Sequence, residues 1–213
     1  PANYVGVKAP MFSFTRLRGA DPTLGVEMAS TGEVACFGAN PQEAWMKALL
    51  STGFKVPERT ILCSVPEKHY DDMLPELWSL HEMGFELLAT PKTFRMLQQK
   101  GIPARLVRQP LEAEDAAAVN VMSLLQTGGV DLVVNLPTPT DLERDADNDY
   151  LIRRTAVDFG IPLLTNPQLI SLFASAMGKH KRGELIGVQP ESLFDYYSRE
   201  SPDEAWTKPD EFH

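Results

Sequence analysis

The chain has 213 residues, of which 43% are hydrophobic and 23% charged, and its formal net charge is −9. This is an ordinary globular composition for one or two domains, with enough residues to bury a core without disulfides or a structural metal. The acidic balance argues against a nucleic-acid partner, and no apolar run reaches the ~18–20 residues of a membrane span. A local site for a small anion is compatible with a negative protein.

The cysteines and histidines point to neither disulfides nor a metal centre. Cys36 and Cys63 form no C-x-x-C motif, so we expect two free, buried thiols and an intracellular, reducing compartment. The four histidines are scattered without metal-ligand spacing. The chain begins at Pro1 with no signal or transit pattern, which predicts a mature product or an excised piece.

Residues 1–57 are predicted to be the tail of a larger domain. Short β-prone runs cover 11–14 and 33–37, and glycines separate them. Asn40 and Pro41 then supply an N-cap and a first-turn proline for a helix that Gly53 ends. These elements are too few to form a domain alone.

From residue 60 onward strands and helices alternate, which predicts a parallel sheet covered on both faces, the α/β class. The expected strands are 60–65, 85–89, 104–107, 130–135 and 161–164. The expected helices are 71–83, 93–100, 116–126, 150–159 and 168–177, with a polar loop over 136–148. We assign residues 58–189 to this domain.

The last stretch, 190–213, contains seven acidic and two basic residues. We expect a docked helix near 192–197 and a loose acidic tail beyond 201.

In an open parallel sheet, a ligand binds outside the carboxyl ends of the strands. The strongest candidate there is the Thr90-Pro91-Lys92-Thr93 turn, where hydroxyls and a lysine precede a helix. A helix N-terminus attracts phosphate or carboxylate groups. The alternative is that Thr90 or Thr93 is simply an N-cap.

Two further segments carry polar groups near the same edge. Asn135 to Thr140 follows the most apolar strand, although Asn, Pro and Thr also favour plain turns. Arg153 and Arg154 project about 100° apart on a helix, so one can face a site and the other solvent. An ion-paired, solvated face is the alternative.

No catalytic arrangement is evident. The sequence has no phosphate-binding G-x-x-x-x-G-K-[ST] loop, no G-x-G-x-x-G turn and no evident Ser-His-Asp or Cys-His set. We expect Cys63 to be an inert core thiol. Trp45, Trp78 and His81 fit the packing faces of helices.

The chain resembles the C-terminal end of the carbamoyl-phosphate synthetase large chain. The segments that carry the resemblance to the end of the second ATP-grasp unit are Val7–Phe14, Ala20–Pro22, Glu27–Val34 and Leu50–Lys55. The remainder resembles the methylglyoxal-synthase-like regulatory domain, and the similarity runs from about residue 7 to about 197. It implies a three-layer α/β/α domain with a five-stranded parallel sheet after an ATP-grasp fragment.

The resemblance also implies a regulatory domain rather than a catalytic one. ATP and Mg or Mn would bind elsewhere in the parent ligase, and this region would carry no cofactor of its own. A methylglyoxal synthase needs a histidine after the phosphate loop, whereas the next histidine after Thr93 is His180. Turnover of dihydroxyacetone phosphate would revive that enzymatic alternative.

The segments 29–38, 153–158 and 160–166 look most similar to the ammonia-using, N-acetylglutamate-activated synthetases of urea and arginine metabolism. The pocket residues that this resemblance implies are Thr90, Lys92, Thr93, Arg108, Gln109, Asn135, Thr138, Asn148, Asp149 and Arg153. Thr90, Thr93 and Asn135 match the family pattern. Arg108-Gln109 stands where the family has an aromatic residue, Thr138 replaces an Asn, and Asp149 replaces another, with Asn148 beside it.

Three functions therefore stand side by side. The first is an allosteric domain for an anionic effector, N-acetylglutamate, with uridine nucleotides (UMP or UTP) of the pyrimidine-type synthetases as the alternative ligand. The second is an interaction module without effector binding, and the third is the methylglyoxal-synthase-like enzyme. The partners expected are the rest of the large chain and a second copy of the protein, in the mitochondrial matrix or the cytoplasm.

Overall fold

The computed structural model describes residues 4–12, 19, 21–22, 30–112, 118–137 and 143–185. Two sheets are present in this part of the chain, one of two strands and one of five. The predicted acidic stretch 190–213, with its expected helix, lies outside the described residues.

The five-stranded sheet is wholly parallel and confirms the predicted α/β class. Its strands are β3 (Thr60–Ser64), β4 (Glu86–Ala89), β5 (Arg105–Leu106), β6 (Leu132–Asn135) and β7 (Leu163–Leu164). They are ordered β5-β4-β3-β6-β7, so the chain runs outward from β3 to one edge and then crosses to the other side of β3.

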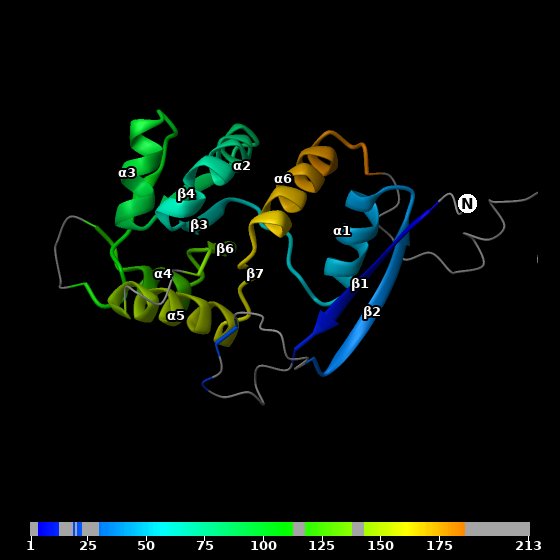
Figure 1. Cartoon of the computed structure of the whole chain (residues 1–213), viewed down its shortest axis with the longest axis horizontal. Helices are drawn as coiled ribbons and strands as arrows, with labels where there is room; N and C mark the ends of the chain where they lie inside the picture. The colour runs from blue at the N-terminus through cyan, green and yellow to red at the C-terminus, as the bar shows by residue number, and fades with distance from the viewer. Residues whose placement is uncertain are drawn as a thin grey trace, which may run out of the picture.

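Helices cover both faces of this sheet (Figure 1). They are α2 (Tyr70–Glu82), α3 (Pro91–Gln99), α4 (Val121–Gln126), α5 (Glu143–Asp158) and α6 (Pro167–Lys181), with a short 3-10 turn η1 (Glu67–His69) before α2. In Figure 1, α2 and α3 lie above the strands, and α4 and α5 lie below them. The three-layer α/β/α arrangement is therefore confirmed.

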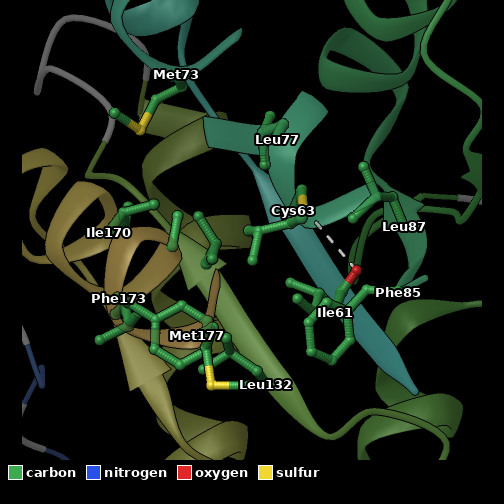
Figure 2. Packing of buried hydrophobic residues seen from close by; sticks show 14 of the residues in the cluster. Ile61, Cys63, Met73, Leu77, Phe85, Leu87, Leu132, Ile170, Phe173 and Met177 are labelled. Atoms are coloured by element: carbon green, nitrogen blue, oxygen red, sulfur yellow. Dashed lines mark hydrogen bonds between the residues drawn. The ribbon is translucent and has the colours of Figure 1, made fainter. Parts of the chain in front are cut away.

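The strand side chains alternate between two apolar clusters, as a sheet buried on both faces requires. On β3, Ile61 and Cys63 pack with α2 and α6, whereas Leu62 packs with α4 and α5. Figure 2 shows the first cluster, in which Cys63 lies among aliphatic and aromatic side chains such as Leu77 and Phe85.

The smaller sheet pairs β1 (Val5–Met11) with β2 (Gly32–Gly38) in antiparallel register, and α1 (Pro41–Ser51) packs on it. Asn40 caps α1 by accepting a hydrogen bond from Glu43 N, as the sequence predicts. The helix joins the larger core through Trp45, whose ring lies 6.2 Å from that of Phe173 on α6. One apolar cluster therefore runs through both parts of the molecule.

Several predicted boundaries were wrong. The strand expected at 11–14 is β1, which ends at Met11, and residues 13–14 lie outside the described part. The last crossover helix, α5, begins at Glu143, inside the segment predicted to be a loop. Acidic residues near a helix start are favoured by the helix dipole, so the polar sequence 143–149 is compatible with a helix.

Two smaller predictions were also wrong. Helix α4 begins at Val121 rather than near 116. Trp78 was expected in the core but is 43% exposed, because the buried face of α2 follows Met73, Leu77 and Leu80. Trp78 flanks that face and lies edge-on to His81.

Gly38 fixes how closely β2 approaches α1. A Cβ at this position would lie 2.5 Å from the backbone nitrogen of Ala44, a contact that a side-chain shift cannot relieve. We expect Gly38→Ala to reduce the free energy of unfolding by about 1–3 kcal/mol. Gly32→Ala on the same strand is the control, since its Cβ would meet no atom within 4 Å. Urea denaturation followed by far-UV circular dichroism measures both, and equal losses would contradict the prediction.

Candidate functional site

Three polar side chains stand side by side at the carboxyl ends of the three central strands. Ser64 ends β3 and is the register partner of Asn135 at the end of β6. Thr90 follows β4 and donates its N–H to Cys63 O at 3.2 Å, which places it beside Ser64. All three are buried, at 6%, 0% and 2% exposure for Ser64, Asn135 and Thr90. We call Thr90, Ser64 and Asn135 the polar row.

Two charged residues of α5 complete the polar row. Strand alternation turns residues 64, 90 and 135 toward the face that α4 and α5 cover. Asp149 Oδ1 accepts hydrogen bonds from Ser64 Oγ at 3.1 Å and from Asn135 Nδ2 at 3.0 Å. One turn later, Arg153 Nη1 donates to Asn135 Oδ1 at 2.9 Å. Asp149 and Arg153 are each 4% exposed, so this network is almost free of water.

The threonines at the start of α3 hold neighbouring segments together. Thr93 Oγ1 accepts a hydrogen bond from Val65 N at 2.9 Å and also lies 3.2 Å from Val65 O, so it ties α3 to the end of β3. Thr90 is the N-cap residue of α3, yet its side chain makes no capping hydrogen bond. Its hydroxyl lies instead 3.2 Å from Ser64 Oγ, within the polar row. The simple N-cap alternative therefore does not describe the role of Thr90.

A cavity of about 460 Å³ opens beside the polar row. Its charged wall consists of Lys68, Lys92 and Arg95 against Glu67 and Asp149, which is three cations and two carboxylates. The remaining lining residues are Ser64, Val65, Pro66, Tyr70, Thr90, Met96, Gln99 and Gln109. A partly charged cleft at this edge of a parallel sheet is the expected form of a site for a small polar ligand.

Tyr70 contributes a neutral phenol to the cavity wall. Burial and the Glu67 carboxylate raise the pKa of Tyr70 above its usual value, while the Arg95 guanidinium acts in the opposite direction. The hydroxyl therefore stays protonated at physiological pH and can donate a hydrogen bond to a ligand.

The structure brings four of the ten predicted site residues into the cavity wall, namely Thr90, Lys92, Gln109 and Asp149. Thr93, Asn135 and Arg153 lie in the hydrogen-bond network behind that wall. Thr138 lies outside the described residues.

Two other predicted residues fix the loop after β5. Asn148 Oδ1 accepts a hydrogen bond from Leu111 N at 2.9 Å. Arg108 Nε donates to Ala118 O at 2.6 Å. These contacts hold the segment that carries Gln109, whose Oε1 is buried without a hydrogen-bond partner among the described residues. Arg108 is not among the residues that line the cavity.

Sequence reasoning missed Ser64, Lys68, Tyr70 and Arg95. Ser64 could have been found, because it ends the first strand of the sheet at the same edge as Thr90 and Asn135. Lys68, Tyr70 and Arg95 come from η1, the start of α2 and the second turn of α3, and no local pattern distinguishes them from ordinary surface residues.

The two neighbouring arginines of α5 have different partners. Arg153 is buried in the network, whereas Arg154, with a side chain 13% exposed, forms an i,i+4 ion pair with Asp158. No three of the described His, Cys, Asp and Glu residues gather as metal ligands. Within the described part of the chain, no helix has the length and apolar character needed to cross a bilayer.

Comparison with known proteins places much of this site in one matched region. Residues 72–165 match the model of the family described as MGS-like domain. The matched range runs from the first turn of α2 to just beyond β7 and includes Thr90, Asn135, Asp149 and Arg153, while Ser64 and Lys68 precede it.

The chain as a whole is similar to parts of much longer proteins. It is 46% identical over 197 residues to the human "Carbamoyl-phosphate synthase [ammonia], mitochondrial". The aligned region is 92% of this chain and 13% of that protein. It is also 46% identical over 187 residues to the Emericella nidulans "Multifunctional protein pyrABCN", covering 84% of this chain and 8% of that protein. The chain thus spans about a tenth of the length of these relatives. The similarity extends beyond the MGS-like domain to most of the sequence.

The free thiols differ in environment and should differ in reactivity. Cys63 is fully buried directly before the polar row, and burial raises the pKa of its thiol to about 12. Because the thiolate is the reactive form, Cys63 should resist a thiol reagent such as DTNB at pH 8, whereas half-buried Cys36 should react. We expect one thiol labelled per native chain and two after denaturation. Labelling of Cys63 in the native state, read by peptide mass, would contradict this.

Proposed function

We propose that this chain is the effector-binding regulatory region of a carbamoyl-phosphate synthetase. A small anionic effector binds in the cavity beside the polar row, and residues 1–57 are the end of an ATP-grasp unit. The observation that carries the proposal is the cavity with three cations at the carboxyl edge of an MGS-like domain. The similarity to carbamoyl-phosphate synthases over most of the chain supports the choice of parent enzyme.

The parent protein would be a ligase that makes carbamoyl phosphate from bicarbonate, ammonia or glutamine, and two ATP, in the mitochondrial matrix or the cytoplasm. ATP and its metal would bind to other parts of that enzyme. This region would act by binding its effector with different affinity in two states of the whole synthetase, which is what allosteric control requires. Its main partner is then the rest of the large chain.

N-acetylglutamate is the effector that we propose first. It carries two carboxylates for the cations of the cavity wall and an amide that can donate and accept hydrogen bonds. Tyr70 and Gln109 offer complementary groups on the same wall, and Gln109 Oε1 has no hydrogen-bond partner among the residues that the structure describes. UMP and UTP are the alternative, since relatives that are pyr multifunctional proteins share a similar identity with the chain.

A thermal-shift experiment with N-acetylglutamate, UMP and UTP in parallel tests the proposal. An effector at about 100 times its dissociation constant adds roughly 2.7 kcal/mol to the native state, which is about 5–10 °C for a chain of this size. We expect that shift with N-acetylglutamate. Arg95→Ala should weaken binding about tenfold, because Arg95 lines the cavity, whereas Lys100→Ala at the exposed end of α3 should leave it unchanged.

Each other outcome has a distinct meaning. A shift with uridine nucleotides alone assigns the chain to a pyrimidine-type synthetase. No shift with any of the three ligands contradicts effector binding and favours the interaction module. Release of methylglyoxal from dihydroxyacetone phosphate would favour the enzymatic alternative instead.

Asp149 adds one of the two negative charges of the cavity wall and should repel a dianionic ligand. Asp149→Asn removes one negative charge from the wall, and an asparagine oxygen can still accept from Ser64 and Asn135. We expect the dissociation constant for N-acetylglutamate to fall about fivefold at low salt, and the gain to shrink as salt screens the charge. Titration calorimetry at two salt concentrations measures this. An unchanged affinity would place the bound carboxylates away from Asp149.

A further inference from the structure

Arg153 makes two sets of contacts that lie on opposite sides of it. On the inner side, Nη1 donates to Asn135 of the polar row at 2.9 Å. On the outer side, Nε and Nη2 donate to the two carboxylate oxygens of Asp21 at 2.8 and 2.6 Å. This forked pair with Asp21 supplies the charge that balances a guanidinium side chain that is only 5% exposed.

Asp21 comes from outside the MGS-like domain, which matches residues 72–165. It lies 132 positions before Arg153 in the sequence. A second contact holds the same segment. Tyr150, three residues before Arg153 on α5, donates from its Oη to Gly19 O at 3.0 Å. Pro22, next to Asp21, is buried. These two contacts therefore dock Gly19 and Asp21, which we call the docked segment, against the helix that closes the polar row.

An unbroken series of hydrogen bonds leads from this docked segment to the cavity. From Asp21 it passes through Arg153 to Asn135, and from Asn135 to Asp149. Asp149 accepts from Ser64, and the hydroxyls of Ser64 and Thr90 are 3.2 Å apart. Asp149, Ser64 and Thr90 all line the cavity.

We propose that Asp21 and Arg153 are positioning residues of the effector site, so that the contact of the docked segment with α5 and the occupancy of the cavity are coupled. This inference rests on the proposed effector binding. Without the Asp21 carboxylate, Arg153 is a buried cation that lacks its forked partner. Asp149, four residues earlier on α5, is the carboxylate then available to it, and a shift of either side chain changes the cavity wall. Linkage makes the effect reciprocal, so a bound effector alters how tightly α5 holds the docked segment.

The test compares Asp21→Asn with Asp158→Asn in the 213-residue chain. Asp158 is the matched control, because it pairs with Arg154, the neighbour of Arg153, and has no contact with the polar row in the described residues. Titration with N-acetylglutamate, UMP and UTP gives the dissociation constant of whichever binds. We expect Asp21→Asn to weaken binding at least fivefold and Asp158→Asn to change it less than twofold. Binding of Asp21→Asn within twofold of the unmodified chain overturns the proposal.

Tyr150→Phe is a milder variant in case Asp21→Asn disturbs folding. It removes the partly exposed hydrogen bond to Gly19 and leaves Arg153 and its partners intact. We expect a weakening of effector binding in the same direction as for Asp21→Asn but smaller. Unchanged binding in Tyr150→Phe, alongside a folded but weakened Asp21→Asn, assigns the coupling to the charge pair alone.

A measurement without ligand separates failure of this inference from failure of the proposed function. Ser64→Ala breaks the network at the cavity end. The loss of melting temperature is measured for Ser64→Ala, for Asp21→Asn and for the double variant. We expect the loss in the double variant to differ from the sum of the two single losses by more than about 2 °C, because both changes act on one network. The same cycle with Asp158→Asn should be additive. If none of the three ligands binds, effector binding fails, and additivity of Asp21→Asn with Ser64→Ala then overturns the coupling as well.

Discussion

The arrangement of the site depends on keeping the Arg153 guanidinium almost entirely out of water. A buried cation is tolerated only where it is paired and hydrogen-bonded, because the lost hydration costs several kcal/mol per ion in practice. Asp21 supplies the opposite charge and Asn135 the remaining hydrogen bond. Asn135 in turn satisfies Asp149, a second buried charge on the same helix. The polar residues at the carboxyl edge of the sheet therefore satisfy the buried charges of α5. The same hydrogen bonds hold α5 in place.

The polar edge belongs to a sheet whose other contacts with its helices are largely apolar. Ile152 and Ala156 of α5 pack with Leu62 and Val133 on the sheet, so the helix is held by an apolar face as well as by Arg153. On the other side of the sheet, α6 packs against the strands and against α1, through Phe173 and Trp45. Arg153 therefore joins the polar edge of the sheet to Asp21, while α6 joins the same sheet to α1.

The sequence predicted the sheet well because its signals are local. Each strand of the parallel sheet is a short apolar run between turn residues, and Asn40 and Asn166 with their following prolines mark helix starts that the structure confirms. The start of α5 was missed because its acidic first turns have the composition of a loop. Trp78 was misplaced because one position on a helix turns a side chain by about 100°, enough to leave a buried face.

The site was predicted only in part, for a different reason. Residues that end strands could be aligned from the rule for parallel sheets, and Thr90 and Asn135 were found in this way. Contacts between distant segments carry no such signal. Asp21 lies 132 residues from Arg153, and nothing in the run Gly19 to Pro22 distinguishes an anchor from a turn. Likewise, Lys68 and Arg95 become neighbours of one cavity only after the chain has folded.

The division of the site into a buried network and an exposed rim separates affinity from specificity. Ser64, Thr93 and Asn135 already have hydrogen-bond partners within the protein, so a ligand that reaches them exchanges one hydrogen bond for another at little net gain. Lys68 and Arg95 are exposed and form no hydrogen bond or ion pair with the other described residues, so an anion that binds them breaks no such contact within the described part of the protein. Attraction at the rim should therefore provide most of the salt dependence of binding. The polar row should select among anions of similar charge, because only a ligand that fits it leaves the buried charges of α5 satisfied.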